Sequence, residues 1–455
     1  MKFADGMLNG IPEDIVLRRI RFCRIFLAAG FILGVAFCVF YAVFLGRDYP
    51  YSTFLFRPAD RFQDFLGVLR MTADRNPYQI KNVIGVLGDS NMIKNVGGVI
   101  MYSHYPTEAS NYFPFTHLLF YPFTLINKYA SLVIYSLFVI GFAVFASAKA
   151  LGDGLSDSIG QRCLNVLVFT LMSYPLLFTL DRGNIEGIIF IFLACAAWLY
   201  LSGRGKLAAA CIGLAASIKG FPIIFLIFFV RERRWKELMI GVAVPVCLTI
   251  VALLFLEGGV FENLTLLRNA LRNFSDLMLF KYNGLTHNIS LFSMLYSFWA
   301  LLHHAFISVA SLRPIIAYYY VVAGIIALAV LAYVFFSRLE FWKAWFVLVA
   351  AVQLLPFPSY DYKLIHTLVP MFLLIRSGKE TRWTRTYLAL LCLIVVPKGF
   401  WILFFDVRCG TIVNPLLILT VCIMIVVEQY YGTLVCSQRS SIESDLPKKT
   451  VTVTE

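Results

Sequence analysis

Long apolar segments recur along almost the whole chain, and short polar segments separate them. A helix needs about 20 apolar residues to cross the hydrocarbon core of a membrane, which is ~30 Å thick. Segments of this kind, some of them too short for a full crossing, lie at residues 23–45, 130–149, 163–180, 184–202, 238–256, 289–309, 314–336, 344–356, 363–375, 386–405 and 411–431. The pattern predicts an all-α polytopic membrane protein, a bundle of about ten to twelve transmembrane and partial helices.

A shorter amphipathic pattern occurs in the long first outer loop, which we expect at residues 46–112. Residues 60–74 have helical spacing, with Phe62, Phe65 and Leu69 on one face. A helix with such an apolar stripe can lie in the plane of a membrane surface. The pattern therefore predicts a helix that buries this stripe in lipid.

Basic clusters between the apolar segments set the predicted orientation. Lys and Arg concentrate at residues 18–24, 231–236 and 376–385, and positive residues in short loops mark the cytoplasmic side. The clusters and the apolar segments together divide the chain into a cytoplasmic N-terminus, a membrane domain and a disordered cytoplasmic tail, at residues 1–22, 23–435 and 436–455.

This orientation requires that segment 112–127 does not cross the membrane. We interpret the segment as a re-entrant or partial helix, which Pro122 interrupts. Arg182 and Asn184 then lie on the outer side, the same side as Asp64. After the apolar segment at 238–256, we expect a second outer loop that extends from residue 257 to residue 287.

Composition agrees with a membrane protein, because 60% of the residues are apolar and only 14% are charged, against roughly 25% charged in soluble domains. The loop clusters explain the net charge of +13, so we expect contact with membrane lipids and no nucleic-acid partner. The ten cysteines include no CxxC pair, which favours packed thiols over a metal site or disulfides. Phosphate-loop, HExxH and Asp-x-Asp motifs are absent, which disfavours ATP-driven transport and nucleotide-sugar chemistry.

The apolar segment at residues 207–230 is interrupted by Lys219, Gly220, Phe221 and Pro222. Glycine and proline disfavour a continuous helix, so the sequence predicts two half-helices that meet within the membrane. A lysine at membrane depth costs free energy unless a negative group compensates it. A phosphate-bearing ligand or a structural carboxylate would supply that group, and the sequence leaves both open.

Ionisable residues at helix ends on the outer side form the candidate site. Asp64 is the candidate general base, and the alternative is Asp60, which could instead pair with a neighbouring arginine. The cations that could stabilise a phosphate leaving group are Lys219, Arg182, His287 and Lys363. The candidate substrate-binding residues are Asn184, Asp361 and Tyr362, and His366 could belong to the site or to the packed core.

Several short motifs follow one another along the chain, at residues 76–78, 112–114, 183–184, 213–222, 233–235 and 359–362. In this order they resemble the polytopic GT-C glycosyltransferases, and within them the bacterial GT87 group that includes polyprenol-phosphate-mannose-dependent mannosyltransferases. The resemblance covers most of residues 20–380. The family often has Gly-Gln where this chain has Gly183-Asn184. That departure, together with the Gly- and Asn-rich insert after Tyr78, leaves the acceptor open.

The resemblance implies a GT-C-like bundle, a polyprenyl-phosphate sugar donor and inversion at the anomeric carbon. It also implies that no metal or other cofactor is required, and that the active site faces away from the cytoplasm. We therefore interpret the chain as a hexosyltransferase of a bacterial plasma (inner) membrane, with mannose as the first candidate sugar. The acceptor would be a lipid-linked or cell-envelope glycan. The alternatives are a transporter or flippase for a lipid-linked or anionic solute, and a glycan polymerase.

Overall fold

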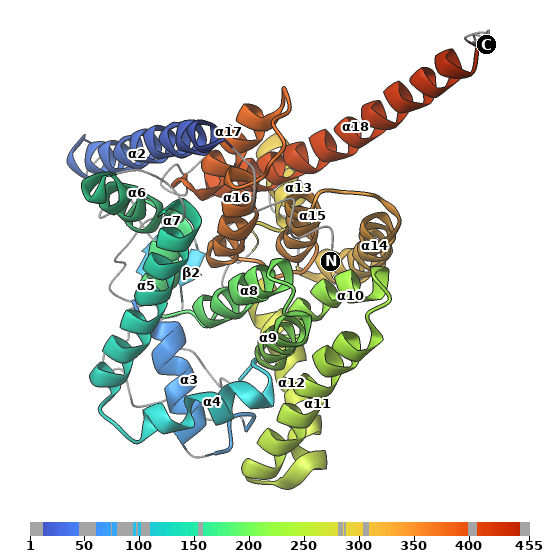
Figure 1. The fold of residues 1–455 in the computed structure, drawn as a ribbon. Helices are drawn as coiled ribbons and strands as arrows, with labels where there is room; N and C mark the ends of the chain where they lie inside the picture. Colours follow the sequence, from blue (N-terminus) through green and yellow to red (C-terminus); the bar gives the residue numbers. More distant parts are fainter. Residues whose placement is uncertain are drawn as a thin grey trace, which may run out of the picture.

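Helices account for nearly all of the regular structure in the computed structural model, and Figure 1 shows their arrangement. The structure describes residues 12–44, 61–73, 75–79, 94–96, 99–101, 110–152, 158–280, 285, 288–303, 309–398 and 407–445. In the first half the helices are α2 (Glu13–Phe44), α3 (Gln63–Ala73), α4 (Pro114–Thr124), α5 (Lys128–Gly152), α6 (Ile159–Leu171), α7 (Tyr174–Arg182), α8 (Glu186–Leu201) and α9 (Gly205–Ile218). The prediction of a helical fold is confirmed.

The second half continues with η2 (Phe221–Leu226), α10 (Ile227–Arg231), α11 (Trp235–Phe255), α12 (Gly259–Phe280), α13 (Leu291–His303), α14 (Val309–Phe336), α15 (Phe341–Leu354), η4 (Asp361–Thr367), α16 (Leu368–Ile375), α17 (Thr384–Val395) and α18 (Cys409–Asp445). In the described residues, the one sheet is a small antiparallel hairpin of β1 (Lys94–Val96) and β2 (Val99–Met101), in which Asn95 pairs with Ile100.

Within the described residues, five helices are long and apolar enough to cross a membrane, at residues 13–37, 128–151, 235–255, 314–336 and 409–431. The bent pair of α6 and α7 makes a sixth candidate span, and shorter apolar helices such as α8, α9, α13, α15 and α17 fill the bundle between them. The chain is therefore a multi-pass integral membrane protein.

The predicted span at 163–180 is not one straight helix. Its two halves, α6 and α7, meet at an angle of 57°. Pro175 lies in the first turn of α7, two residues after the N-cap residue Ser173. Proline has no N–H to donate to the preceding turn, so it starts a new helix instead of continuing the old one.

The amphipathic stripe of α3 is buried in protein, and not in lipid as the sequence suggested. Phe65, Val68 and Leu69 are buried, and the Phe65 ring packs against the rings of Phe120 and Tyr135, with centroid distances of 5.8 and 5.0 Å. The helix α4 that supplies Phe120 has eleven residues. At 1.5 Å per residue it is about half the length needed to cross, in keeping with a partial helix.

Helical structure also extends into two segments for which the sequence predicted none, a second outer loop and a disordered tail. The segment expected to be a second outer loop folds from Gly259 to Phe280 as the amphipathic helix α12. At the C-terminus, α18 continues to Asp445, ten residues into the segment expected to be a disordered tail. Extending a formed helix needs no new nucleation, which explains why helical structure continues beyond the apolar part. By the same principle α2 begins at Glu13, before the predicted start of its apolar segment.

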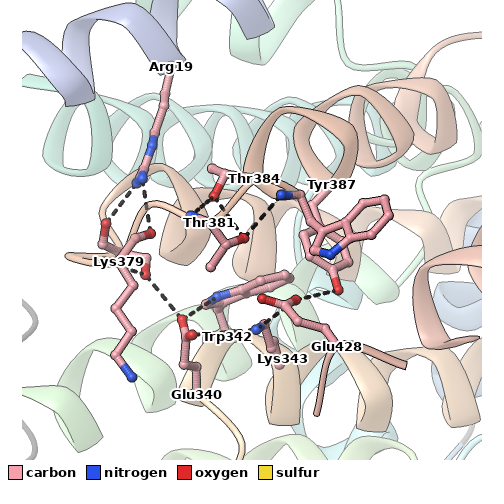
Figure 2. Close-up of polar contacts among 11 residues, drawn as sticks. Arg19, Glu340, Trp342, Lys343, Lys379, Thr381, Thr384, Tyr387 and Glu428 are labelled. Atoms are coloured by element: carbon pink, nitrogen blue, oxygen red, sulfur yellow. Dashed lines mark hydrogen bonds and ion pairs between the residues drawn. The ribbon is translucent and has the colours of Figure 1, made fainter. Parts of the chain in front are cut away.

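Arg19 of α2 fixes the first helix to the end of α16. Its guanidinium donates hydrogen bonds to backbone carbonyls at the end of α16 and just beyond it, those of Leu374, Ile375, Ser377 and Lys379. The last carbonyls of a helix have no partner within the helix. A buried arginine from another helix therefore supplies the missing donors, as Figure 2 shows in part.

Next to Arg19 lies a set of paired side chains that we call the Glu340–Glu428 network (Figure 2). Lys343 of α15 forms ion pairs with Glu340 at 3.4 Å and with Glu428 of α18 at 3.0 Å. Glu340 also accepts a hydrogen bond from Trp342 Nε1, and Glu428 accepts one from the Tyr387 hydroxyl of α17. The network ties α15, α17 and α18 together, with each carboxylate bound to at least two donors.

Candidate active site

Asp64 lies in the first turn of α3, where the positive end of a helix favours a carboxylate. The turn is fixed from the α7 side: the Phe62 N–H donates to the Asp181 carbonyl at 2.7 Å. Phe62 adopts a left-handed backbone conformation with a φ of 59°. Asn184 Nδ2 donates to Asp64 Oδ2 at 2.6 Å. Two of the predicted site residues, Asp64 and Asn184, are thus in direct contact although 120 positions separate them.

The connection between α7 and α8 requires a glycine, followed by a residue whose side chain can both donate and accept hydrogen bonds. Gly183 has a φ of 63°, and a Cβ added there would lie 2.6 Å from the Cβ of Phe65. Asn184 is 2% exposed and uses both ends of its amide. While Nδ2 binds Asp64, Oδ1 accepts from the backbone N–H of Glu186 at 3.0 Å. Its backbone carbonyl accepts from the Tyr135 hydroxyl.

Glu186, the first residue of α8, connects the two sides of the site, and the sequence analysis missed it. The residue is fully buried. Lys219 Nζ donates to Oε1 at 2.8 Å, and His366 Nε2 donates to Oε2 at 2.8 Å. A glutamate two positions after Asn184, inside an otherwise apolar segment, was the signal that could have identified it. Glu186 is therefore the structural carboxylate that the sequence left open as one of two partners for Lys219.

The helix break at Lys219 is confirmed. The helix α9 ends at Ile218 and η2 begins at Phe221, and the Ile218 carbonyl accepts a hydrogen bond from the Thr116 hydroxyl of α4. The ammonium of Lys219 lies 5.3 Å from the ring centroid of Tyr112 and 5.5 Å from that of Tyr362. Aromatic faces attract cations at such distances. The predicted substrate-binding residue Tyr362 is therefore adjacent to Lys219.

Lys363 adds a second cation, which is buried, to this side of the site. It is 7% exposed, and its Nζ lies 5.7 Å from the ring centroid of Phe221. Within the part of the chain that the structure describes, Nζ has no hydrogen-bond or ion-pair partner. Burial lowers the pKa of Lys363 to about 8; the nearby carboxylate of Glu186 opposes this shift and the charge of Lys219 adds to it. An anionic ligand would compensate both effects.

Asp361 and Arg182 lie near the site but have other partners. The Tyr174 hydroxyl of α7 donates to Asp361 Oδ2 at 2.8 Å. Burial raises the pKa of Asp361, while Tyr174 and the charge of Arg408 act in the opposite direction. Arg182 lies over the ring of Phe178, 5.3 Å from its centroid. These contacts do not involve Lys219 or Lys363, so both residues remain candidates by position alone.

Two predicted site residues, Asp60 and His287, lie outside the described residues. Across the described ranges, no three His, Cys, Asp or Glu side chains come together in a way that could hold a metal ion. The described site therefore consists of a carboxylate, Asp64, and a cationic side with Lys219 and Lys363. The segment from Asn184 to Glu186 connects them.

Comparison with known proteins adds two findings. The sequence model of glycosyltransferase family 87 matches residues 111–359, which is more than half of the 455-residue chain and includes Asn184, Glu186 and Lys219. A stretch of 87 residues is 33% identical to an alpha-(1->3)-arabinofuranosyltransferase of Corynebacterium glutamicum. That stretch covers 19% of this chain and 21% of the relative, so the two proteins are similar over about a fifth of their lengths.

Proposed function

The chain belongs to glycosyltransferase family 87, and we propose that it transfers a hexose, mannose first, from a polyprenyl-phosphate donor to a glycan acceptor. The acceptor is lipid-linked or part of the cell envelope, and transfer occurs on the extracytoplasmic side of a bacterial plasma membrane. The observation that carries this proposal is the connection, through Asn184 and Glu186, of the Asp64 carboxylate to the cationic side of the site.

The reaction is an inverting displacement at the anomeric carbon of the donor sugar. Asp64 removes the proton from an acceptor hydroxyl, and the resulting oxygen attacks the anomeric carbon from the face opposite the phosphate. As the new C–O bond forms, the bond between the sugar and the phosphate oxygen breaks, and its electron pair stays on the phosphate. The products are the extended glycan, polyprenyl phosphate and protonated Asp64, which returns its proton to water.

The cationic side of the site stabilises the leaving group. Charge develops on the phosphate as the bond breaks, and preorganised cations in a buried site interact strongly with it. Lys219 uses one of its three ammonium hydrogens on Glu186 and can offer the others to the phosphate. Lys363 lacks a direct partner within the described residues, so it is the second phosphate ligand that we propose.

Arabinofuranose is the second candidate sugar, because the similar stretch of the Corynebacterium glutamicum protein belongs to an arabinofuranosyltransferase. Membership in a family of glycosyltransferases favours transfer over the transporter interpretation. A glycan polymerase that uses lipid-linked acceptors would carry out the same sugar transfer.

The experiment uses the full chain purified in lipid nanodiscs. It is incubated with radiolabelled polyprenyl-phosphate mannose or polyprenyl-phosphate arabinofuranose and with a lipid extract as the acceptor source. We expect released polyprenyl phosphate and label in the glycan fraction with one donor, and neither product with Asp64→Asn. Transfer at wild-type rate by Asp64→Asn would reject Asp64 as the base. A wild-type protein that consumes neither donor would reject the proposed function.

A further inference from the structure

Glu186 has no part in the displacement, although it holds two of the groups nearest to the proposed phosphate site. It is fully buried, and both carboxylate oxygens are occupied, by Lys219 on one side and His366 on the other. An anion beside a phosphate would normally oppose phosphate binding. A buried carboxylate at this position therefore needs a reason beyond stabilising the fold.

We propose that Glu186 is a positioning residue that competes with phosphate for Lys219, and so promotes release of the polyprenyl-phosphate product. This inference rests on the proposed function, since it presupposes a phosphate-linked donor. It assigns to Glu186 a role in the release of product, separate from proton removal by Asp64.

The charges of donor and product explain why a competitor is useful. The donor is a phosphodiester with one negative charge, whereas the product is a phosphomonoester whose charge is about −1.5 to −2 at neutral pH. Lys219 and Lys363 alone would give the cationic side of the site a formal charge of +2, which favours the product. With Glu186 the sum is +2 − 1 = +1, which matches the donor. The carboxylate thus lowers the affinity for product more than the affinity for donor.

His366 allows Glu186 to give up Lys219 without being left unpaired. When Lys219 turns to the phosphate, Oε2 still accepts from His366 Nε2. A buried carboxylate with no donor would cost several kcal/mol, so the second partner keeps this exchange accessible. The other ring nitrogen of His366, Nδ1, is buried with no hydrogen-bond partner among the described residues. It remains available to a ligand.

The test measures binding by the full chain in nanodiscs with two probes, a short-chain polyprenyl phosphate and its methyl ester. The ester has the single charge of the donor. Glu186→Gln should bind the monoester at least about ten-fold more tightly than the wild type, and should bind the methyl ester only slightly more tightly. Glutamine can keep both contacts, because its carbonyl accepts from Lys219 and its amide donates to the other tautomer of His366.

Glu428→Gln is the matched control, since it removes the same charge from a carboxylate that also binds a lysine, Lys343, and should leave both affinities unchanged. Unchanged or weaker monoester binding by Glu186→Gln would show that Glu186 is structural and overturn the proposal. If that variant does not fold, the wild type decides: monoester binding ten-fold tighter than ester binding would overturn the proposal, and comparable affinities would support it. Failure of the wild type to bind either probe would instead reject the proposed function.

Discussion

Two glutamate–lysine networks lie in the described part of the protein, and their partners differ in a way that separates support from function. In the Glu340–Glu428 network, Lys343 has two carboxylates, and each carboxylate has a further donor in Trp342 or Tyr387. Around Glu186 the balance is reversed, because one carboxylate serves Lys219 while a second cation, Lys363, lies nearby. In the first network the lysine and both carboxylates are paired without a ligand, whereas the second network has one more cation than carboxylates.

The largest expected effect is loss of turnover in Asp64→Asn. Removal of a general base costs about 10² to 10⁴-fold in rate. The asparagine can still accept from Asn184, so the protein should remain folded with a melting temperature close to that of the wild type. Glu428→Gln, from the other network, should retain activity. Transfer assays on both variants test this difference between the networks, and melting in detergent checks that both variants are folded. Equal losses of transfer activity in the two variants would contradict it.

The next effect is on stability, where the two lysines should differ. Lys219→Met leaves the fully buried Glu186 with His366 alone and should lower the free energy of unfolding by about 3 kcal/mol. Lys343→Met should cost about 1 kcal/mol, since both of its carboxylates keep a donor and are partly exposed. Thermal unfolding measures both variants. A greater loss in Lys343→Met would reverse the order that we expect.

Lys363, the second cation beside Glu186, predicts a pH dependence of phosphate binding. Burial lowers the pKa of Lys363 to about 8, so the ammonium is charged below that pH and neutral above it. Above about pH 8, well beyond the second pKa of the phosphate at about 6, affinity for polyprenyl phosphate should therefore fall, by at most about ten-fold for each further pH unit. The variant Lys363→Arg should keep its charge and lose this decline. Titration of the wild type and this variant between pH 6 and 10 provides the measurement, and parallel curves would exclude Lys363.

The smallest effect is expected for Asp361→Asn. Asp361 accepts a hydrogen bond from Tyr174, which does not belong to the cationic side of the site. Its neutral replacement should change the Michaelis constant for donor by less than about three-fold, a difference below 1 kcal/mol. Steady-state kinetics with varied donor test this. A ten-fold rise in the Michaelis constant would show that Asp361 belongs to the donor site, which would then extend beyond Lys363.

The sequence predicted the parts of the site that have a strong local signal. Glycine and proline after Lys219 marked the helix break, and Asp64 and Asn184 stood out as polar residues between apolar segments. It could not show which partner Lys219 takes, because Glu186 and His366 reach the site from segments 180 residues apart. Such contacts depend on tertiary packing, which hydrophobic periodicity does not encode.

The fold was predicted in class but not in detail, for a related reason. An amphipathic helix has the same pattern whether protein or lipid covers its apolar face. The sequence therefore could not tell that the stripe of α3 packs on Phe120 and Tyr135. In the same way, the residues of α12 contain too many polar side chains to be recognised as a membrane segment, and only the structure shows them as helix.

Arg19 bears on how the protein is made. Its carbonyl partners lie 355 to 360 positions later in the chain. At about 5–20 residues per second, the ribosome reaches them roughly 20–70 s after Arg19 has been synthesised. The first helix must therefore be synthesised before any of these partners exists, and it reaches its final position only after α16 has been made. Biogenesis of this enzyme should be limited by this late docking, and chains that end before α16 should be left to the proteases of the membrane.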